Sequence, residues 1–196
     1  ILKNLNENFK FSRYEHSFIW LKEAGVALPV YCVQEPQVPL LLSKATNLFK
    51  LFLSDVGLLA AMYADGLQIR ILNKENNINF GSVYENAVAQ ELCAHGFEVY
   101  YFNNKKQGEL DFVIEFEGKA LPLEVKSGKD YTKHRALNHV LESPNYHIQN
   151  AIVFCNENIE VKDQIFYCPI YMAGFLEKRT VPEDYIYTLD LSVLQD

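Results

Sequence analysis

The chain has 196 residues, of which 49% are hydrophobic, and a formal net charge of -7. A chain of this length can bury a sizeable core, so we expect one large domain or a medium-sized domain with an appendage. The acidic balance argues against a protein whose whole surface attracts nucleic acid, and no apolar run is long enough to cross a membrane. The four cysteines form no CxxC pair, so neither a zinc site nor a disulfide framework is predicted, and the cytoplasm is the expected compartment.

The first 55 residues predict an appendage. Ser12 and Glu15 have the spacing of a capping box, which would open a helix that ends at Gly25. Strands are expected at 28–34 and 48–53. This order resembles the second half of a winged helix. Its helix carries acids as well as bases, so we expect it to pack against protein rather than to read a DNA groove.

The middle of the chain predicts a linker. Asp55 is placed to cap a short apolar helix that begins at Val56. The asparagine-rich stretch at 65–79 is polar and is the best candidate for a domain boundary. We therefore expect four parts, listed by residue number: a partial winged-helix-like segment at 1–55, a helix and connection at 56–80, the main domain at 81–175 and a tail at 176–196. The tail is expected to add a strand or a helix. Ile1 is no start methionine and opens no signal peptide, so we also expect a piece of a longer protein.

The main domain reads as an α/β fold. Its predicted elements are, in order, a helix at 81–95, a strand at 97–102, a hairpin at 109–126, a helix at 131–142 and strands at 151–155 and 164–172. An antiparallel meander followed by a crossover helix predicts that the next strand lies parallel to its neighbour. The five histidines have no metal-ligand spacing and are expected on the surface, while the tyrosines are expected to be half-buried strand residues.

The hairpin carries the strongest chemical signal. Only Glu117 and Gly118 join its strands, and a two-residue turn of this kind would place Asp111 opposite Glu124. Alternation then predicts Asp111, Glu124 and Lys126 on one face. The opposite face would hold Leu110, Phe112, Ile114, Phe116, Leu121, Leu123 and Val125. Facing carboxylates repel by roughly 3 kcal/mol at an effective dielectric constant near 20, and a bound divalent cation would reverse that sign.

Two further features have alternative interpretations. Glu85 lies on the same face of its helix as the apolar stripe, where a charge is costly unless it is compensated. Ser82 and Glu85 also have the spacing of a capping box, in which Glu85 would bond the Ser82 amide. The sequence favours neither interpretation of Glu85 over the other. A basic run that includes Lys129, Lys133 and Arg135 follows the hairpin. It is either a solvated helix face or a set of phosphate contacts.

Glu85, Asp111 and the tripeptide Glu124-Val125-Lys126 resemble the PD-(D/E)xK signature of restriction-endonuclease-like nucleases. More specifically, residues 50–59, 81–86, 109–112 and 124–128 resemble the C-terminal domain of unknown function attached to a large prokaryotic group of AAA+ ATPases. The resemblance covers residues 48–172. It implies a restriction-endonuclease-like mixed sheet flanked by helices, with a partial winged helix in front of it.

The resemblance implies a Mg²⁺- or Mn²⁺-dependent nuclease that hydrolyses phosphodiester bonds of DNA. Asp111 and Glu124, with the Val125 carbonyl, would hold the metal. Lys126 would orient the attacking water or stabilise the transition state, and Glu85 would position the metal or Lys126.

The resemblance also implies an ATPase domain upstream, through which the protein can assemble into an oligomer. The chain itself lacks a GxxxxGK[ST] phosphate loop, so ATP would bind only to that upstream domain.

Two alternatives stay open at this stage. The charged residues can be a surface salt-bridge cluster in which Lys126 pairs with Glu109 and Asp111 is solvated. The nuclease fold can also serve as a non-catalytic interaction or regulatory module of the ATPase. Convergence of Glu85, Asp111 and Glu124 on one point, with Lys126 beside them, would favour the nuclease.

Overall fold

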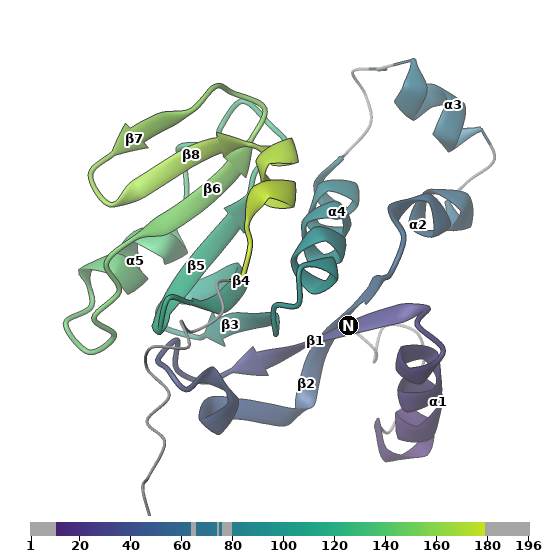
Figure 1. Ribbon diagram of the computed structural model, residues 1–196, viewed down its shortest axis with the longest axis horizontal. Helices are drawn as coiled ribbons and strands as arrows, with labels where there is room; N and C mark the ends of the chain where they lie inside the picture. Colours follow the sequence, from purple (N-terminus) through teal and green to yellow (C-terminus); the bar gives the residue numbers. More distant parts are fainter. Residues whose placement is uncertain (1–10, 64–65, 74, 76–79, 179–196) are drawn as a thin grey trace, which may run out of the picture.

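The computed structural model describes residues 11–63, 66–73, 75 and 80–178 (Figure 1). The helices are α1 (Phe11–Glu23), α2 (Val56–Met62), α3 (Leu67–Leu72), α4 (Gly81–Ala94) and α5 (Arg135–Glu142), with 3-10 helices η2 (Leu40–Ser43) and η3 (Ile170–Phe175). The strands are β1 (Ala27–Val33), β2 (Lys44–Leu53), β3 (Tyr100–Asn104), β4 (Gly108–Phe116), β5 (Lys119–Val125), β6 (Ala151–Cys155), β7 (Glu160–Lys162) and β8 (Ile165–Pro169).

Within the described residues, eight strands form one mixed sheet in the order β2-β1-β3-β4-β5-β6-β8-β7. The pairs β1–β3, β5–β6 and β6–β8 are parallel, and the other pairs are antiparallel. Helix α5 is the crossover that lets β6 run parallel to β5, as the sequence predicted. The prediction of an α/β fold with a mixed sheet flanked by helices is confirmed.

Two apolar clusters contain most of the buried hydrophobic residues in the described part of the chain. One joins Val88 and Leu92 of α4 to Phe112 and Leu123 of the sheet. The other joins Leu137 of α5 and its neighbours to a different set of strand residues, which includes Leu110, Val113 and Val153. Since alternate residues of a strand point to opposite faces, α4 and α5 cover opposite faces of the central strands.

The N-terminal hairpin of β1 and β2 belongs to this same sheet, because β1 pairs with β3. The strand predicted at 28–34 is confirmed within one residue, and β2 begins earlier than predicted, at Lys44. Ser12 lies inside α1, so the predicted capping box does not open that helix. The stretch predicted as a polar connection contains helix α3. The winged-helix interpretation of residues 1–55 stays a prediction.

The ends of other elements also differ from expectation. Strand β3 begins at Tyr100 and α5 at Arg135, each later than predicted. Strand β8 ends at Pro169 where η3 takes over, and the hairpin partner β7 was not predicted. Asp55 does cap α2, since its side chain accepts a hydrogen bond from the Leu58 amide at 3.0 Å. Most of the predicted tail, residues 179–196, lies outside the described residues.

Asn86 fastens α4 to the end of β2. It is 1% exposed, accepts a hydrogen bond from the Leu53 amide at 2.8 Å and donates one to the Leu53 carbonyl at 2.9 Å. A side-chain amide that bonds both groups of one residue takes the place of a neighbouring strand. This contact fixes β2 relative to α4, and both elements contribute to the site described below.

Replacing Asn86 with alanine is expected to lower the free energy of unfolding by about 2 kcal/mol, because both Leu53 backbone groups lose their partner in a partly buried position. Urea denaturation followed by circular dichroism measures this loss. The exposed Asn150 provides the matched control, and Asn150→Ala should leave the midpoint unchanged. Equal midpoints for the two variants would show that the Asn86 bonds contribute nothing.

Candidate functional site

The β4–β5 hairpin has the predicted register. Phe112 faces Leu123 and Phe116 faces Lys119, which is the pairing that a two-residue turn imposes. Glu117 and Gly118 have φ values of 50° and 75°, as a turn with both central residues in the left-handed region requires. The two strands therefore deliver their acidic residues to neighbouring positions.

A bulge in β4 changes the predicted faces. Across β3 and β4, Tyr100 pairs with Val113 but Phe102 pairs with Leu110, so β4 contains one extra residue between these pairs. Leu110 consequently packs in the α5 cluster and not with Phe112, contrary to the prediction. The residue that the bulge displaces is Asp111, and its Oδ2 accepts a hydrogen bond from the Val125 amide at 2.9 Å.

Glu124 is the buried member of the carboxylate pair. It is 3% exposed, and its Oε2 lies 2.7 Å from the Lys126 Nζ. Burial raises the pKa of Glu124 to about 8; Asp111, to which its side chain is hydrogen-bonded, adds to the rise and Lys126 opposes it. Near neutral pH the site therefore retains a proton on Glu124 that a cation can replace.

Glu85 lies on α4, above the same part of the sheet. It is half-buried, and burial followed by the charge of Asp111 raises its pKa, while Lys50 and Lys126 act in the opposite direction. The capping-box alternative is wrong, because Ser82 lies inside α4 and its hydroxyl bonds the Tyr63 hydroxyl at 2.7 Å. Glu85 therefore lies close enough to Asp111 and Lys126 for their charges to interact.

Lys126 pairs with Glu124, and Glu109 pairs with Lys50, so the alternative in which Lys126 pairs with Glu109 across the hairpin does not hold. Burial alone would lower the pKa of Lys126, but the carboxylates of Glu124, Asp111 and Glu85 together raise it. The ammonium group therefore stays charged at neutral pH. It can stabilise negative charge but is a poor proton acceptor.

Lys50 is a site residue whose role the sequence did not reveal. Its Nζ lies 2.6 Å from the Glu109 Oε1 and 5.0 Å from the centre of the Tyr101 ring. Glu109 also accepts a hydrogen bond from Asn103 at 2.7 Å. Lys50 comes from β2, which two strands separate from β4 in the sheet, so only the folded chain brings these residues together.

A cavity of about 450 Å³ opens beside the carboxylates. Its charged lining residues are Lys50, Glu85, Glu109 and Asp111, and its apolar ones are Phe18, Phe49, Leu51 and Phe52. The aromatic residues come from α1 and β2, and the acids come from α4 and β4. The N-terminal part of the chain thus supplies much of the wall of the site.

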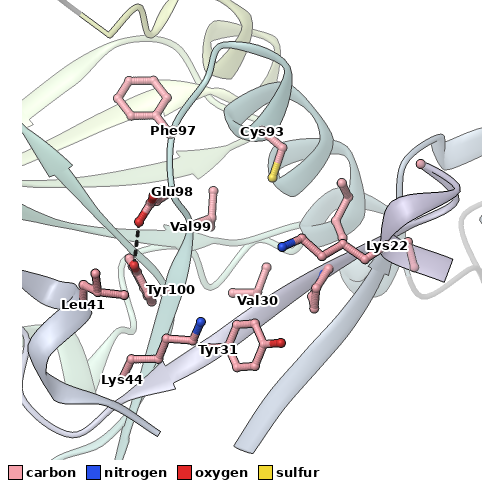
Figure 2. A pocket seen from close by; sticks show the side chains of 14 residues that line it. Lys22, Val30, Tyr31, Leu41, Lys44, Cys93, Phe97, Glu98, Val99 and Tyr100 are labelled. Carbon is pink, nitrogen blue, oxygen red and sulfur yellow. Dashed lines mark hydrogen bonds between the residues drawn. The ribbon is translucent and has the colours of Figure 1, made fainter. Parts of the chain in front are cut away.

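A second cavity, of about 410 Å³, lies between α1, β1 and the segment before β3 (Figure 2). Lys22 extends into it from α1, and Glu98 accepts a hydrogen bond from the Tyr100 hydroxyl at 2.8 Å. Cys93 lines this cavity too, but burial raises the pKa of its thiol to about 11. The thiol is therefore protonated and is not a nucleophile at neutral pH.

The basic residues predicted to contact phosphate are separate from the cavities. Lys129, Lys133 and Arg135 are exposed, and Lys133 pairs with Asp130 at 2.8 Å. Their role stays a prediction. His134 corrects another prediction, because it is buried rather than on the surface and bonds the Tyr167 hydroxyl at 2.7 Å.

The donor set determines which metal can fit. Among the residues that the structure describes, no group of three or more His, Cys, Asp or Glu side chains is arranged to hold a metal ion. Asp111 and Glu124 offer two carboxylates. A strand residue's carbonyl points the same way as its amide, so the Val125 carbonyl also faces β4. Mg²⁺ needs only one or two carboxylates, because water and substrate phosphates complete its shell, and this set fits it.

Comparison with known families gives one match. Residues 80–172 match the family model of a domain of unknown function (DUF4143). The predicted domain of unknown function is thus supported for this region, which contains Glu85, Asp111, Glu124 and Lys126. Neither the curated proteins nor the solved structures gave a match. In the described part of the chain, no helix has the length and apolar character to span a bilayer.

Proposed function

We propose that the DUF4143 region and the hairpin before it form a Mg²⁺-dependent nuclease site that hydrolyses phosphodiester bonds of DNA. The observation that carries this proposal is the pair of Asp111 and Glu124 on adjacent strands with the Lys126 ammonium 2.7 Å from Glu124. Two carboxylates and a lysine are the groups that phosphodiester hydrolysis needs for a cation and for the charge on phosphate.

The reaction is a single displacement at phosphorus. The oxygen of water forms a bond to phosphorus, the bond to the leaving sugar oxygen breaks, and the water's proton passes through solvent to that oxygen. A Mg²⁺ ion held by Asp111, Glu124 and the Val125 carbonyl would supply an acidified water and offset the phosphate charge.

The protein's own residues have distinct parts in this scheme. Lys126, which stays charged at neutral pH, would donate a hydrogen bond to the phosphate oxygens as negative charge builds up. Glu85 would help to hold the metal or to orient Lys126, since its charge interacts with those of both Asp111 and Lys126. The ATPase domain upstream and the assembly through it are part of the same proposal.

Titration calorimetry with Mg²⁺ and Mn²⁺, together with cleavage of single- and double-stranded DNA, tests the proposal. The wild type is expected to bind metal and cut DNA, and Asp111→Asn is expected to lose both. Asp163→Asn is the matched control, because this exposed turn residue has φ near 53° and asparagine tolerates that conformation. Folded wild-type protein that binds neither metal and cuts neither DNA would overturn the proposal and favour an interaction module.

A further inference from the structure

The cavity beside the carboxylates has a chemically mixed lining. Phe18 and Phe49 are half-buried, with ring centroids 5.1 Å apart and ring planes at 72°. Lys50, Glu85 and Asp111 line the same space. A ligand that fills it must therefore combine a flat apolar group with a group that carries charge.

We infer that this cavity binds one unpaired nucleotide of single-stranded DNA, with the base against Phe18 and Phe49 and the phosphate toward Asp111. The inference rests on the proposed function and narrows its substrate class. Stacking of a base on an aromatic ring contributes about 1–3 kcal/mol and depends little on sequence, because every base has a flat face.

The size of the cavity favours an unpaired nucleotide. Its volume of about 450 Å³ falls within the range of sites for small molecules. A base in a duplex would bring its paired partner with it, and that partner would need comparable space. Helix α1 packs against β1 and contributes Phe18 to the wall of this cavity.

The charge of the lining argues against binding that relies on phosphate contacts alone. The lining contains three carboxylates, those of Glu85, Glu109 and Asp111, and one ammonium group, that of Lys50. The whole chain carries a net charge of -7. Duplex binding relies on many contacts between basic residues and phosphates, and this surface is poorly equipped for them. Stacking must therefore supply a large share of the affinity.

Fluorescence anisotropy tests the inference with a labelled oligonucleotide, alone and annealed to its complement, in buffer with Ca²⁺. The single strand is expected to bind about tenfold more tightly than the duplex. Phe49→Leu is expected to weaken single-strand binding by about tenfold and to leave duplex binding unchanged. Phe175→Leu is the matched control, because Phe175 is 73% exposed and lies in η3. If Phe49→Leu fails to fold, Phe18→Leu on α1 makes the same test.

Cleavage by the same protein preparations, measured with Mg²⁺ in place of Ca²⁺, tests the nuclease proposal separately from the inference. The inference is overturned if the protein binds the single strand and the duplex with equal affinity. It is also overturned if neither Phe49→Leu nor Phe18→Leu weakens single-strand binding. Both outcomes count even where cleavage is observed. Preference for the single strand that depends on Phe49 supports the inference even if no cleavage occurs, in which case the nuclease proposal alone fails. Absence of any DNA binding overturns the inference. Absence of both metal binding and cleavage overturns the nuclease proposal.

Discussion

Lys126→Met is expected to lower DNA cleavage by about 10³-fold while Mg²⁺ binding persists. The Lys126 ammonium pairs with Glu124, and an ammonium group cannot be a metal ligand. The variant therefore removes the charge that is proposed to face the phosphate and leaves both carboxylates. A preorganised donor aimed at developing negative charge has effects of this size in other enzymes. Single-turnover kinetics measures the cleavage rate, and titration calorimetry of the same protein measures the Mg²⁺ affinity.

The matched control for this change is Lys162→Met. Lys162 is an exposed lysine of β7 that pairs with Glu160, as Lys126 pairs with Glu124, but it is remote from Asp111 in the sheet. It should retain full cleavage. Complete loss of Mg²⁺ binding in Lys126→Met, at unchanged stability, would contradict the separate roles assigned to the lysine and the carboxylates.

The affinity for Mg²⁺ is expected to rise about tenfold between pH 6 and 7 and about fivefold between pH 7 and 8. Because burial and Asp111 raise the pKa of Glu124 to about 8, a proton competes with the cation throughout this range. Titration calorimetry at several pH values measures the slope. In Glu124→Gln the slope should vanish together with most of the affinity, whereas the exposed Glu142→Gln should behave as the wild type.

The same group determines how the metal-free protein responds to pH. The folded-state pKa of Glu124, about 8, exceeds the ordinary value of 4.5, so the folded chain binds more protons than the unfolded chain between these values. The free energy of unfolding therefore falls as pH rises from about 5 to 8, and this contribution is fully present only below the ordinary pKa. Glu124→Gln should flatten the dependence in urea denaturation. An identical slope in the variant would show that Glu124 is not the titrating group.

Local rules predicted the hairpin correctly. The register of β4 on β5 depends on the turn at Glu117 and Gly118, and both strands lie within a few residues of it. The helix at 81–95 and the parallel strand at 151–155 were likewise predicted from periodicity and order alone. These features are encoded in short stretches of sequence.

The parts that were missed depend on distant contacts. The bulge at Asp111 exists only relative to β3, so alternation within β4 could not reveal it. The pairing of Lys50 with Glu109 spans two intervening strands. His134 is buried, and its Nε2 shares a hydrogen bond with the hydroxyl of Tyr167, which lies far along the chain. No pattern within one segment contains this information.

The order of strands has a practical consequence for fragments of this protein. The family match begins at residue 80, yet the neighbour of β3 on its outer side is β1, which precedes that point. A fragment cut at residue 80 would uncover the edge of β3, where Phe102 is fully buried, and would present unpaired backbone groups to other chains. It would also lack Phe49 and Lys50. The region that matches the family model is therefore smaller than the unit that folds, and folded material should require the N-terminal hairpin.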